Sequence, residues 1–515
     1  MPVAAPTDAA RVRRLAAAAA AFALLLFAVV LGNGFALDDP YLVVRNPYLV
    51  SINLPRFFTS DYWEPTIRSG LYRPLVTTSY ALNRVLGGVD PRGYHALNVL
   101  LHAANAALAL LVLHRLTGRL ALATLAAFLF AVHAVHAEVL ANVSLGRPEL
   151  LAALFFLLAL RSYRPAGPVS LASLLWFALG LLSKESAATL VAVLPLVDAL
   201  YGAGAAPGVR GALAVWRRRL PVYGVYALLA VGYLGLRFLA LKGGGVLPLE
   251  RELDNPLMTL PAGWRIANAL WVAFHYAWLL VFPLRLAYDY SLDQIPLIRS
   301  AGDPRLLFVV AGWALAAAGL AWCGRRGRDA FFGILFTLAT FSVVSNVAAP
   351  IGTILGERLL YLPSLGFCLA LAAGLAALAG RLAPAPGARR RTLGALGALL
   401  VALHGARAVV RCLDWRTENG LYVHDLAVNP RSAKIQSNAG AALAELGRHE
   451  EALRAFAAAR EIAPTFLAPR QGTVLSLVAL GRFEEAQQAY REALRFGPPN
   501  PEVEEQIARG LRRQR

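Results

Sequence analysis

The sequence predicts an all-α membrane protein, in which a bundle of about 11 transmembrane helices is followed by a soluble helical repeat domain. Three observations support this prediction. The 515 residues are 58% hydrophobic and only 16% charged, whereas soluble domains carry about 25% charged residues. Apolar runs recur along residues 15–410. After about Cys412 the composition becomes charged and a repeat begins. These features exclude a single soluble enzyme, a disordered chain and a fibrous repeat.

Mostly apolar segments are the candidates for transmembrane helices, since a helix needs roughly 20 such residues to cross a bilayer. The first one follows Arg11, Arg13 and Arg14, as a signal peptide would. Residues 33–38 make a poor cleavage site, so we expect a retained signal anchor. The candidates lie at approximately 15–32, 94–113, 120–135, 149–163, 168–183, 186–202, 221–241, 264–283, 305–322, 330–349, 363–380 and 392–410.

The arginine distribution assigns each loop to a side of the membrane, because short arginine-rich loops stay in the cytoplasm. With the N-terminus inside, every loop up to Arg219 falls on its expected side, and an even number of crossings must precede the next arginine-rich loop. Segment 264–283 is expected not to cross, since Arg265, Asn268 and His275 favour a cavity-lining or re-entrant helix. The result is 11 crossings with the C-terminus outside; 12 crossings, with the C-terminus inside, is the alternative. The arginines used are Arg115, Arg119, Arg161, Arg164, Arg210, Arg217–Arg219, Arg325, Arg326, Arg328, Arg381 and Arg389–Arg391.

The net charge of +19 does not indicate a nucleic-acid partner. Of 50 basic residues only Lys184, Lys242 and Lys434 are lysine, which leaves 47 arginines and is typical of a GC-rich genome. The three cysteines are too few for a disulfide framework and lack metal-ligand spacing. The sequence has no phosphate-binding glycine-rich loop, nucleotide motif or nucleophile elbow. This argues against nucleotide-driven chemistry and favours a donor carried by a lipid.

The C-terminal residues repeat with a period of 34, a pattern typical of the paired helices of tetratricopeptide repeats. We therefore expect a transmembrane domain over 1–411 and a repeat domain over 412–515, with clear repeats at about 433–466 and 467–500. The repeats would offer a docking surface; a helical cap that packs on the membrane domain is the alternative. The matching positions are Gly447 with Gly481, Glu450–Ala452 with Glu484–Ala486, Phe456 with Tyr490, Ala459 with Ala493, and Pro464 with Pro498.

Polar residues gather in the loops that this topology places outside. Asp38 and Asp39 directly follow the first helix, where adjacent carboxylates repel each other and one pKa rises. Such a carboxylate can act as a general base on a lipid-borne substrate, although an acidic pair after a helix is also typical of a solvated turn. Arg73 adds a cation to the same loop.

The next outside loop holds His133, His136 and Glu138, which could bind a divalent cation or move a proton. The alternative is an interfacial helix with satisfied histidines. Arg147 could hold a phosphate, whereas Glu149 could cap the helix dipole. No spacing requires a metal, so no metal ligand is assigned and a divalent cation stays open.

Two further turns place charges outside. Lys184 and Glu185 interrupt a long apolar stretch, where charges are costly unless they are paired or face water. An ion pair between the two is the simplest arrangement. Glu357, Arg358 and Tyr361 lie at the outer mouth of two helices, where arginine suits a lipid phosphate. The mixed charges outside therefore indicate a chemical site at that face.

Together these motifs resemble the transmembrane and tetratricopeptide-repeat-containing O-mannosyltransferases, which are GT-C superfamily glycosyltransferases. The resemblance covers residues 35–500 approximately, and implies a GT-C-type membrane core and a polyprenyl-phosphate sugar donor, with mannose as the expected sugar. It rests on Asp38-Asp39, Tyr72–Leu75, Phe130–Glu138, Gly146–Leu150, Ser183–Glu185, Asp254–Pro256, Tyr288–Ser291 and Gly356–Ser364.

The resemblance also implies roles for individual residues. Asp38 or Asp39 takes the place of the outer-loop catalytic pair and would deprotonate an acceptor hydroxyl in a direct, inverting displacement. Glu138 joins the catalytic group. The residues expected to bind the donor phosphate or the substrate are Arg73, His136, Arg147, Lys184, Glu185, Glu357, Arg358 and Tyr361.

The expected acceptor is a Ser or Thr hydroxyl of a protein, and a lipid or glycan acceptor is the alternative. The composition looks bacterial, so we expect a multi-pass protein of the inner membrane, with a cytoplasmic N-terminus and the repeats outside. Two other classes stay open. One is a non-enzymatic scaffold that recruits partners through its repeats. The other is a transporter, which only Arg265, Asn268 and His275 favour.

Overall fold

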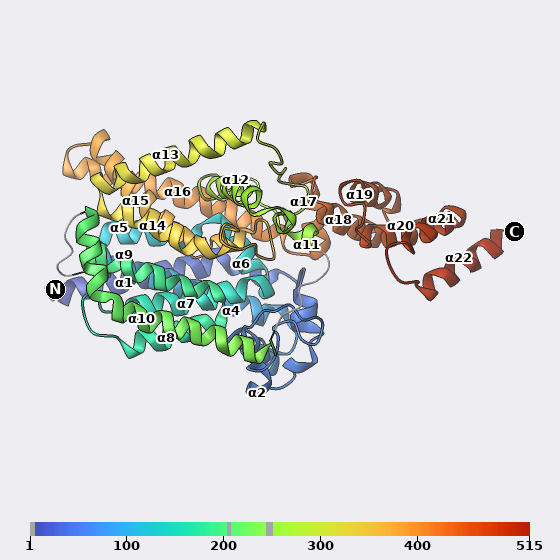
Figure 1. Cartoon of the computed structure of the whole chain (residues 1–515), viewed down its shortest axis with the longest axis horizontal. Coiled ribbons are helices and arrows are strands. Elements are labelled where there is room, and N and C mark those ends of the chain that lie inside the picture. The colour runs from blue at the N-terminus through green and yellow to red at the C-terminus, as the bar shows by residue number, and fades with distance from the viewer. Residues whose placement is uncertain (1–5, 203–207, 244–250, 515) are drawn as a thin grey trace.

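The computed structural model describes residues 6–202, 208–243 and 251–514, and within these ranges every regular element is a helix. A long bundle makes up most of the molecule, and helices α17–α22 extend from one end of it (Figure 1). The bundle contains α1 (Pro6–Phe27), α4 (Pro91–Thr117), α5 (Leu120–Val132), α6 (Ala137–Ala141), α7 (Val143–Ser162), α8 (Leu171–Ser183), α9 (Leu190–Tyr201), α10 (Gly208–Ala240), α12 (Ala262–Val281), α13 (Pro304–Arg326), α14 (Arg328–Phe341), α15 (Pro363–Leu382) and α16 (Pro386–Asp414). The loops hold α2 (Leu54–Phe57), α3 (Pro74–Gly87), α11 (Arg251–Asp254) and the short turns η4 (Ala134–His136), η5 (Glu185–Thr189), η7 (Ser342–Val344) and η8 (Glu357–Leu360).

Each apolar segment predicted from the sequence falls on a helix, and the all-helical membrane architecture is confirmed. Among the described residues, 7 helices are long and apolar enough to cross a membrane, and a pair bent by 46°, α5 with η4–α6, would be an eighth. Helices α8, α9 and α14 have 13, 12 and 14 residues, fewer than the roughly 20 that a bilayer requires. The 11 crossings therefore stay a prediction. The seven candidates are Ala9–Gly32, α4, α7, α10, α13, α15 and α16.

Glycine allows a close helix contact in the bundle, between α14 and α15. A Cβ atom added to Gly333 would lie 2.5 Å from the Gly366 carbonyl oxygen, and one added to Gly366 would lie 2.4 Å from the Gly333 carbonyl oxygen. Neither position can hold a larger residue without moving backbone. Small residues at helix contacts are the usual way for apolar helices to gain packing in lipid, where burial itself supplies no driving force.

The arginine-rich turns lie together at one end of the bundle, where the N-terminus also lies (Figure 1). Arg119 pairs with Asp329 at 2.9 Å, and Arg328 donates to the Leu200 carbonyl oxygen at 3.3 Å. One detail differs from the prediction: Arg217–Arg219 lie inside α10, which begins at Gly208 rather than near residue 221. The turns that were predicted to share one side of the membrane thus share one end of the molecule.

The C-terminal helices follow the predicted period of 34 residues. They are α17 (Glu418–Val428), α18 (Ala433–Glu445), α19 (His449–Ile462), α20 (Ala468–Ala479), α21 (Phe483–Ala493) and α22 (Pro501–Gln514). The Phe456 ring of α19 packs against Gly440 of α18 and Gly472 of α20. A Cβ atom added to Gly440 would lie 2.6 Å from the ring, and one added to Gly472 would lie 2.3 Å from it. The helix pairs α18–α19 and α20–α21 coincide with the two predicted repeats; their identification as tetratricopeptide repeats stays a prediction.

Buried polar contacts fasten the start of this C-terminal region to the bundle. The guanidinium of Arg411, at the end of α16, donates to both oxygens of Asp425 in α17 at 2.7 and 2.9 Å, and both side chains are fully buried. Asp425 also accepts from the backbone N–H of Tyr288 at 2.7 Å. Since one partner alone would leave a buried charge uncompensated, α17 is held at a fixed place over the loop that follows α12.

Candidate functional site

Two cavities adjoin at the end of the bundle from which the C-terminal helices extend. The large cavity has a volume of about 660 Å³ and lies between the bundle and helices α17 and α18. The small cavity, of about 260 Å³, is lined in part by residues of α7, η5 and η7. The residues lining both are Asp38, Trp63, Leu71, Leu145, Gly352, Thr353 and Arg358. Asp38 and Arg358 are the charged members of this shared wall.

The structure separates the roles of the two adjacent aspartates. The carboxylate of Asp39 is fully buried and accepts from the backbone N–H groups of Ser144, Val143 and Ala36 at 2.7, 3.2 and 3.3 Å. It therefore satisfies donors at the start of α7. Asp38 faces both cavities, and in the part of the chain that the structure describes its carboxylate accepts no hydrogen bond. Of the pair, Asp38 is the one open to a ligand.

Burial raises the pKa of each of these carboxyl groups to about 6. For Asp38 the cations Lys434 and Arg358 oppose the effect of burial, whereas for Asp39 the hydrogen bonds from Ser144 and Val143 do. A base works best when its pKa lies near the working pH. Asp38 combines that pKa with access to a cavity.

Arg358 is held at the junction of the cavities by Glu138. The Glu138 carboxylate, which is 1% exposed, accepts from the Arg358 guanidinium at 2.6 Å and from its backbone N–H at 2.8 Å. Burial opposes the charge on Arg358, but Glu138 outweighs it and raises the pKa of Arg358. The guanidinium thus stays charged and keeps donors that face the cavity wall.

Two further ion pairs lie beside the small cavity, and Arg73, Lys184 and Glu185 line it. The guanidinium of Arg73, at the start of α3, pairs with Glu185 at 2.9 Å, and Lys184 pairs with Glu149. Although burial opposes its ionisation, Glu185 has its pKa lowered by Arg73 to about 2. The predicted pair between neighbours Lys184 and Glu185 is therefore not the contact formed, because each reaches a different helix. Three predicted phosphate ligands, Arg73, Lys184 and Arg358, do line one cavity.

The C-terminal helices supply one wall of the large cavity, which the sequence motifs did not indicate. Its residues from α17 to α20 are Glu418, Tyr422, Lys434, Asn438 and Phe466. Glu418 accepts from the backbone N–H of Leu37 at 2.9 Å, and Asn438 donates to the Tyr288 hydroxyl at 3.0 Å. One signal could have found this wall: of three lysines in the chain, Lys184 and Lys434 both line these cavities.

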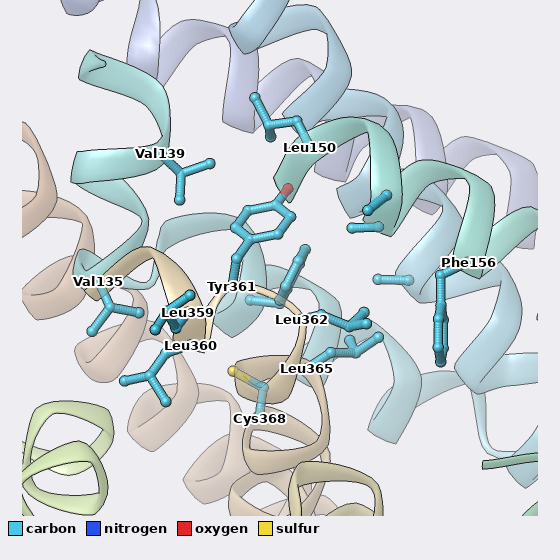
Figure 2. Close-up of a cluster of buried hydrophobic side chains, with 14 of the residues drawn as sticks. Val135, Val139, Leu150, Phe156, Leu359, Leu360, Tyr361, Leu362, Leu365 and Cys368 are labelled. Atoms are coloured by element: carbon cyan, nitrogen blue, oxygen red, sulfur yellow. The ribbon is translucent and has the colours of Figure 1, made fainter. Parts of the chain in front are cut away.

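His136 and Tyr361 lie in the packed interior and line neither cavity. Nε2 of His136 lies 2.9 Å from the Ser364 hydroxyl, and its ring packs against that of Tyr361 with the ring centres 4.6 Å apart and the planes tilted by 56°. The Tyr361 hydroxyl lies 2.8 Å from Nδ1 of His102 and accepts from Asn105 at 3.1 Å. Figure 2 shows the Tyr361 ring surrounded by apolar side chains such as Val139, Leu150 and Leu365. The geometry gives both residues a packing role.

Arg147 and Glu357 are also buried away from the cavities. Arg147 donates to Asn98 at 2.6 Å, to Asn83 and the Tyr94 carbonyl at 3.0 Å, and to Ser79 at 3.1 Å, which occupies its donors without any carboxylate. Glu357 accepts from Ala287 N–H at 2.6 Å and from the Tyr290 hydroxyl at 2.7 Å, and burial raises its pKa.

Neither residue therefore reaches the space in which a donor phosphate would bind. For metals, the described residues contain no group of three His, Cys, Asp or Glu side chains arranged to hold an ion. His133, the other histidine of the predicted loop, has Nε2 at 3.0 Å from the Leu280 carbonyl oxygen.

Comparison with known proteins shows which family this chain resembles. The family model "Protein O-mannosyl-transferase TMTC, DUF1736" matches residues 244–317. The chain is 32% identical over 491 residues to Protein O-mannosyl-transferase TMTC4 of Mus musculus, with 84% of this chain and 64% of that protein covered. It is 29% identical over 452 residues to Protein O-mannosyl-transferase F38B6.6 of Caenorhabditis elegans, covering 85% and 61%. With Mus musculus TMTC3 the identity is 29% over 462 residues, covering 84% and 49%.

These matches confirm the resemblance inferred from the motifs. The chain spans between about half and two thirds of the length of these curated relatives. No solved structure matches it.

Proposed function

We propose that this chain, a relative of the TMTC protein O-mannosyl-transferases, is a glycosyltransferase that moves mannose from a polyprenyl-phosphate donor to a hydroxyl group of an acceptor protein. The observation that carries the proposal is the junction of the two cavities. There a carboxylate without a hydrogen-bond partner among the described residues, Asp38, shares a wall with a fixed guanidinium, Arg358. Together they supply what the transfer needs: a base for the acceptor and a cation for the leaving phosphate.

The reaction balances with these two residues. The acceptor O–H gives its proton to the Asp38 carboxylate while the acceptor oxygen forms a bond to the anomeric carbon. The bond from that carbon to the phosphate oxygen breaks, and the lipid phosphate leaves with the electron pair. A single displacement of this kind inverts the anomeric centre. Arg358 stabilises the charge that develops on the leaving phosphate, an effect that is often the largest in catalysis.

The two cavities suit different substrates. The small cavity combines three cations with apolar Val343, Val344 and Ile351, as a phosphate on a hydrocarbon chain requires. The large cavity opens toward the C-terminal helices, and Trp63 and Tyr422 are among its aromatic residues, which suits a polypeptide acceptor. We assign the donor to the small cavity and the acceptor to the large one.

The proposed topology has 11 crossings, with the arginine-rich end in the cytoplasm and the cavities at the outer face of the membrane. Its support is the path of α12. Arg265, in the first turn of α12, donates to the Asn346 and Val347 carbonyl oxygens. In the segment that follows α12, the Ala287 N–H donates to the Glu357 carboxylate. The first turn of α12 and the segment that follows α12 thus contact the same loop, 346–357, which supports a helix that does not cross. A bacterial inner membrane, residues 1–411 as the transferase domain and residues 412–515 as the repeat domain complete the proposal.

The test is transfer of labelled mannose by the purified full-length protein. Polyprenyl-phosphate mannose is incubated with an envelope extract, and labelled products are separated into protein, lipid and glycan fractions. Label in protein that survives lipid extraction and is released by β-elimination is the expected result. Label in the lipid or glycan fraction alone would mean that the acceptor is a lipid or a glycan rather than a protein.

The matched control is Asp38→Asn, which keeps the volume of the side chain and removes the base. Equal labelling by the variant would reject Asp38 as the base. No transfer from any polyprenyl-phosphate sugar by the folded protein would reject the glycosyltransferase and favour a scaffold that uses its C-terminal helices to recruit partners.

A further inference from the structure

One cation of the large cavity comes from the C-terminal helices rather than from the bundle. Lys434 lies in the first turn of α18, nearly 400 residues after Asp38, and both side chains line the same cavity. Its ammonium group forms an ion pair with Asp254 of α11, which lines that cavity as well. The chain thus brings a charged group from its C-terminal region to the wall where Asp38 lies.

The start of α18 is fixed in place by contacts on both sides of Lys434. The Ser432 hydroxyl donates to Asp289 at 2.6 Å, and the Ala433 backbone N–H donates to the Leu292 carbonyl oxygen at 2.8 Å. Ser432 also caps α18 by accepting from the Ile435 N–H at 3.1 Å. Since backbone and side chain are both held, the long lysine side chain starts from a defined point and its ammonium reaches Asp254.

Several elements place charged or titratable groups around Asp38. Two are cations, Arg358 from η8 and Lys434 from α18, and both stabilise the ionised carboxylate, whereas Asp39 and Asp254 destabilise it. The remaining groups that line the large cavity are Tyr41, Tyr288, Asp289, Glu418 and Tyr422. Arg358 is already neutralised by Glu138 at 2.6 Å. Lys434 is the cation that the C-terminal helices contribute to this cavity.

We propose that Lys434 is a positioning residue of the transfer site: it holds Asp254 and keeps Asp38 ionised, so that the C-terminal helices are part of the catalytic unit and not an appendage. This inference rests on the proposed function, in which Asp38 is the base. Lys434 acts on the acceptor only through these two carboxylates. Its removal affects the protonation of the base and leaves donor recognition unchanged.

The electrostatics give the sign of the effect. Burial raises the pKa of Asp38 to about 6, and Lys434 is the strongest of the groups that lower it. Removing the ammonium raises that pKa further, and the unpaired Asp254 acts in the same direction. A base must be ionised to accept a proton, so activity on the acid side is lost at a higher pH. Loss of an opposite charge close to a carboxylate typically moves its pKa by about one unit.

The experiment measures kcat/KM against pH for the full-length protein and three variants. In the native protein the acid limb is expected near pH 6, the pKa of Asp38. Lys434→Met is expected to move it upward by about one unit and to leave the donor KM unchanged. Lys434→Arg keeps the charge and is expected to restore the native limb. Arg431→Gln is the matched control. Arg431 lies three residues before Lys434 and pairs with Asp293 at 2.8 Å, but it lines neither cavity. The acid limb of this variant is therefore expected at the native pH.

A second readout does not depend on activity. Carbodiimides label protonated carboxyl groups, so labelling of Asp38, mapped by tandem mass spectrometry against pH, reports the same titration. A Lys434→Met protein whose acid limb and labelling curve both match the native ones overturns the inference, even where turnover falls. A protein that labels with the predicted shift but transfers no sugar supports the electrostatic role and rejects the proposed function. Melting temperatures of all variants identify any that fails to fold.

Discussion

The two ends of the bundle use basic residues in different ways. At the arginine-rich end, guanidinium groups bind helix ends as well as aspartates: Arg115 donates to the carbonyl oxygens of Leu160 and Tyr163, at the end of α7, at 3.3 and 2.5 Å, and Arg119 pairs with Asp329. At the cavity end, each cation that lines one of the two cavities pairs with a carboxylate. These pairs are Arg73–Glu185, Lys184–Glu149, Arg358–Glu138 and Lys434–Asp254.

The contrast separates structural charge from functional charge. The last carbonyl groups of a helix lack partners within it and carry a partial negative charge, so arginines that bind them stabilise helix ends. Charges in pairs beside a cavity are different, because each pair holds a cation where a ligand can reach it. Substitutions at the cavity end should therefore change catalysis, and matched substitutions at the arginine-rich end should change little.

The largest effect on turnover is expected at the two adjacent aspartates, whose surroundings differ although they are neighbours in sequence. Asp38→Asn removes the proposed base, and loss of a general base typically costs about 100- to 10,000-fold in rate. Because the Asp38 carboxylate has no hydrogen-bond partner among the described residues, the melting temperature of the Asp38→Asn protein should equal that of the native protein. Turnover and thermal unfolding of the detergent-purified protein are the measurements.

Asp39→Asn is the companion variant. Its carboxylate accepts three backbone N–H groups, and an amide NH₂ would face donors there, so the expected result is a lower melting temperature. The interpretation fails where Asp39→Asn is as stable as the native protein while Asp38→Asn unfolds.

The next effect concerns Arg358 and Glu138. Arg358→Gln is expected to reduce kcat by about 100-fold, the usual size for losing a group that stabilises developing charge. It also leaves Glu138 buried without its partner, which destabilises the protein. The double variant Arg358→Gln with Glu138→Gln should recover stability but not activity. Recovery of both would show that the pair acts only in folding.

The fold was predictable to the extent that it depends on hydrophobicity. Apolar runs placed the helices, because a helix in lipid satisfies its own backbone and needs only apolar side chains. Boundaries were less certain where a helix continues into water. Arg217–Arg219 were expected in a loop, yet α10 includes them, since a charged surface does not interrupt backbone hydrogen bonding. The packing of Phe456 between Gly440 and Gly472 follows the repeat.

The candidate site was predictable only in part. Residue type and loop position singled out Asp38, Arg73, Lys184 and Arg358, which line the cavities, within a longer set of candidates. They could not predict the partners of these residues, because pairing depends on which helices lie side by side. Buried residues such as Arg147 and His136 carry the same chemistry in sequence, and only their satisfied hydrogen bonds or packing separate them from the site. The rarity of lysine marks Lys434 in the sequence, but nothing local links α18 to the first loop, so its place beside Asp38 could not be predicted.

A moderate effect is expected from Arg73 in the small cavity. Arg73→Gln removes a cation that faces the proposed donor site, and a hydrogen bond to a charged group contributes enough for about a tenfold rise in KM. The KM for polyprenyl-phosphate mannose should rise, with the acceptor KM unchanged. Arg84→Gln serves as the control, because Arg84 donates to the Val43 and Val44 carbonyl oxygens and lines neither cavity. A rise only in the acceptor KM would mean that the acceptor, and not the donor, binds in the small cavity.

The smallest effect is expected at the arginine-rich end, and it tests the contrast between the two ends most directly. Arg119→Gln removes the ion pair with Asp329, but the Arg119 side chain is 52% exposed and Asp329 keeps the hydrogen bond from the Tyr201 hydroxyl at 3.0 Å. Exposed pairs typically contribute less than about 1 kcal/mol. Turnover and donor KM should therefore match the native protein, and the melting temperature should fall only slightly. A tenfold loss of turnover with native stability would mean that the arginine-rich end takes part in catalysis, and that a position beside the two cavities does not distinguish the functional charges from the structural ones.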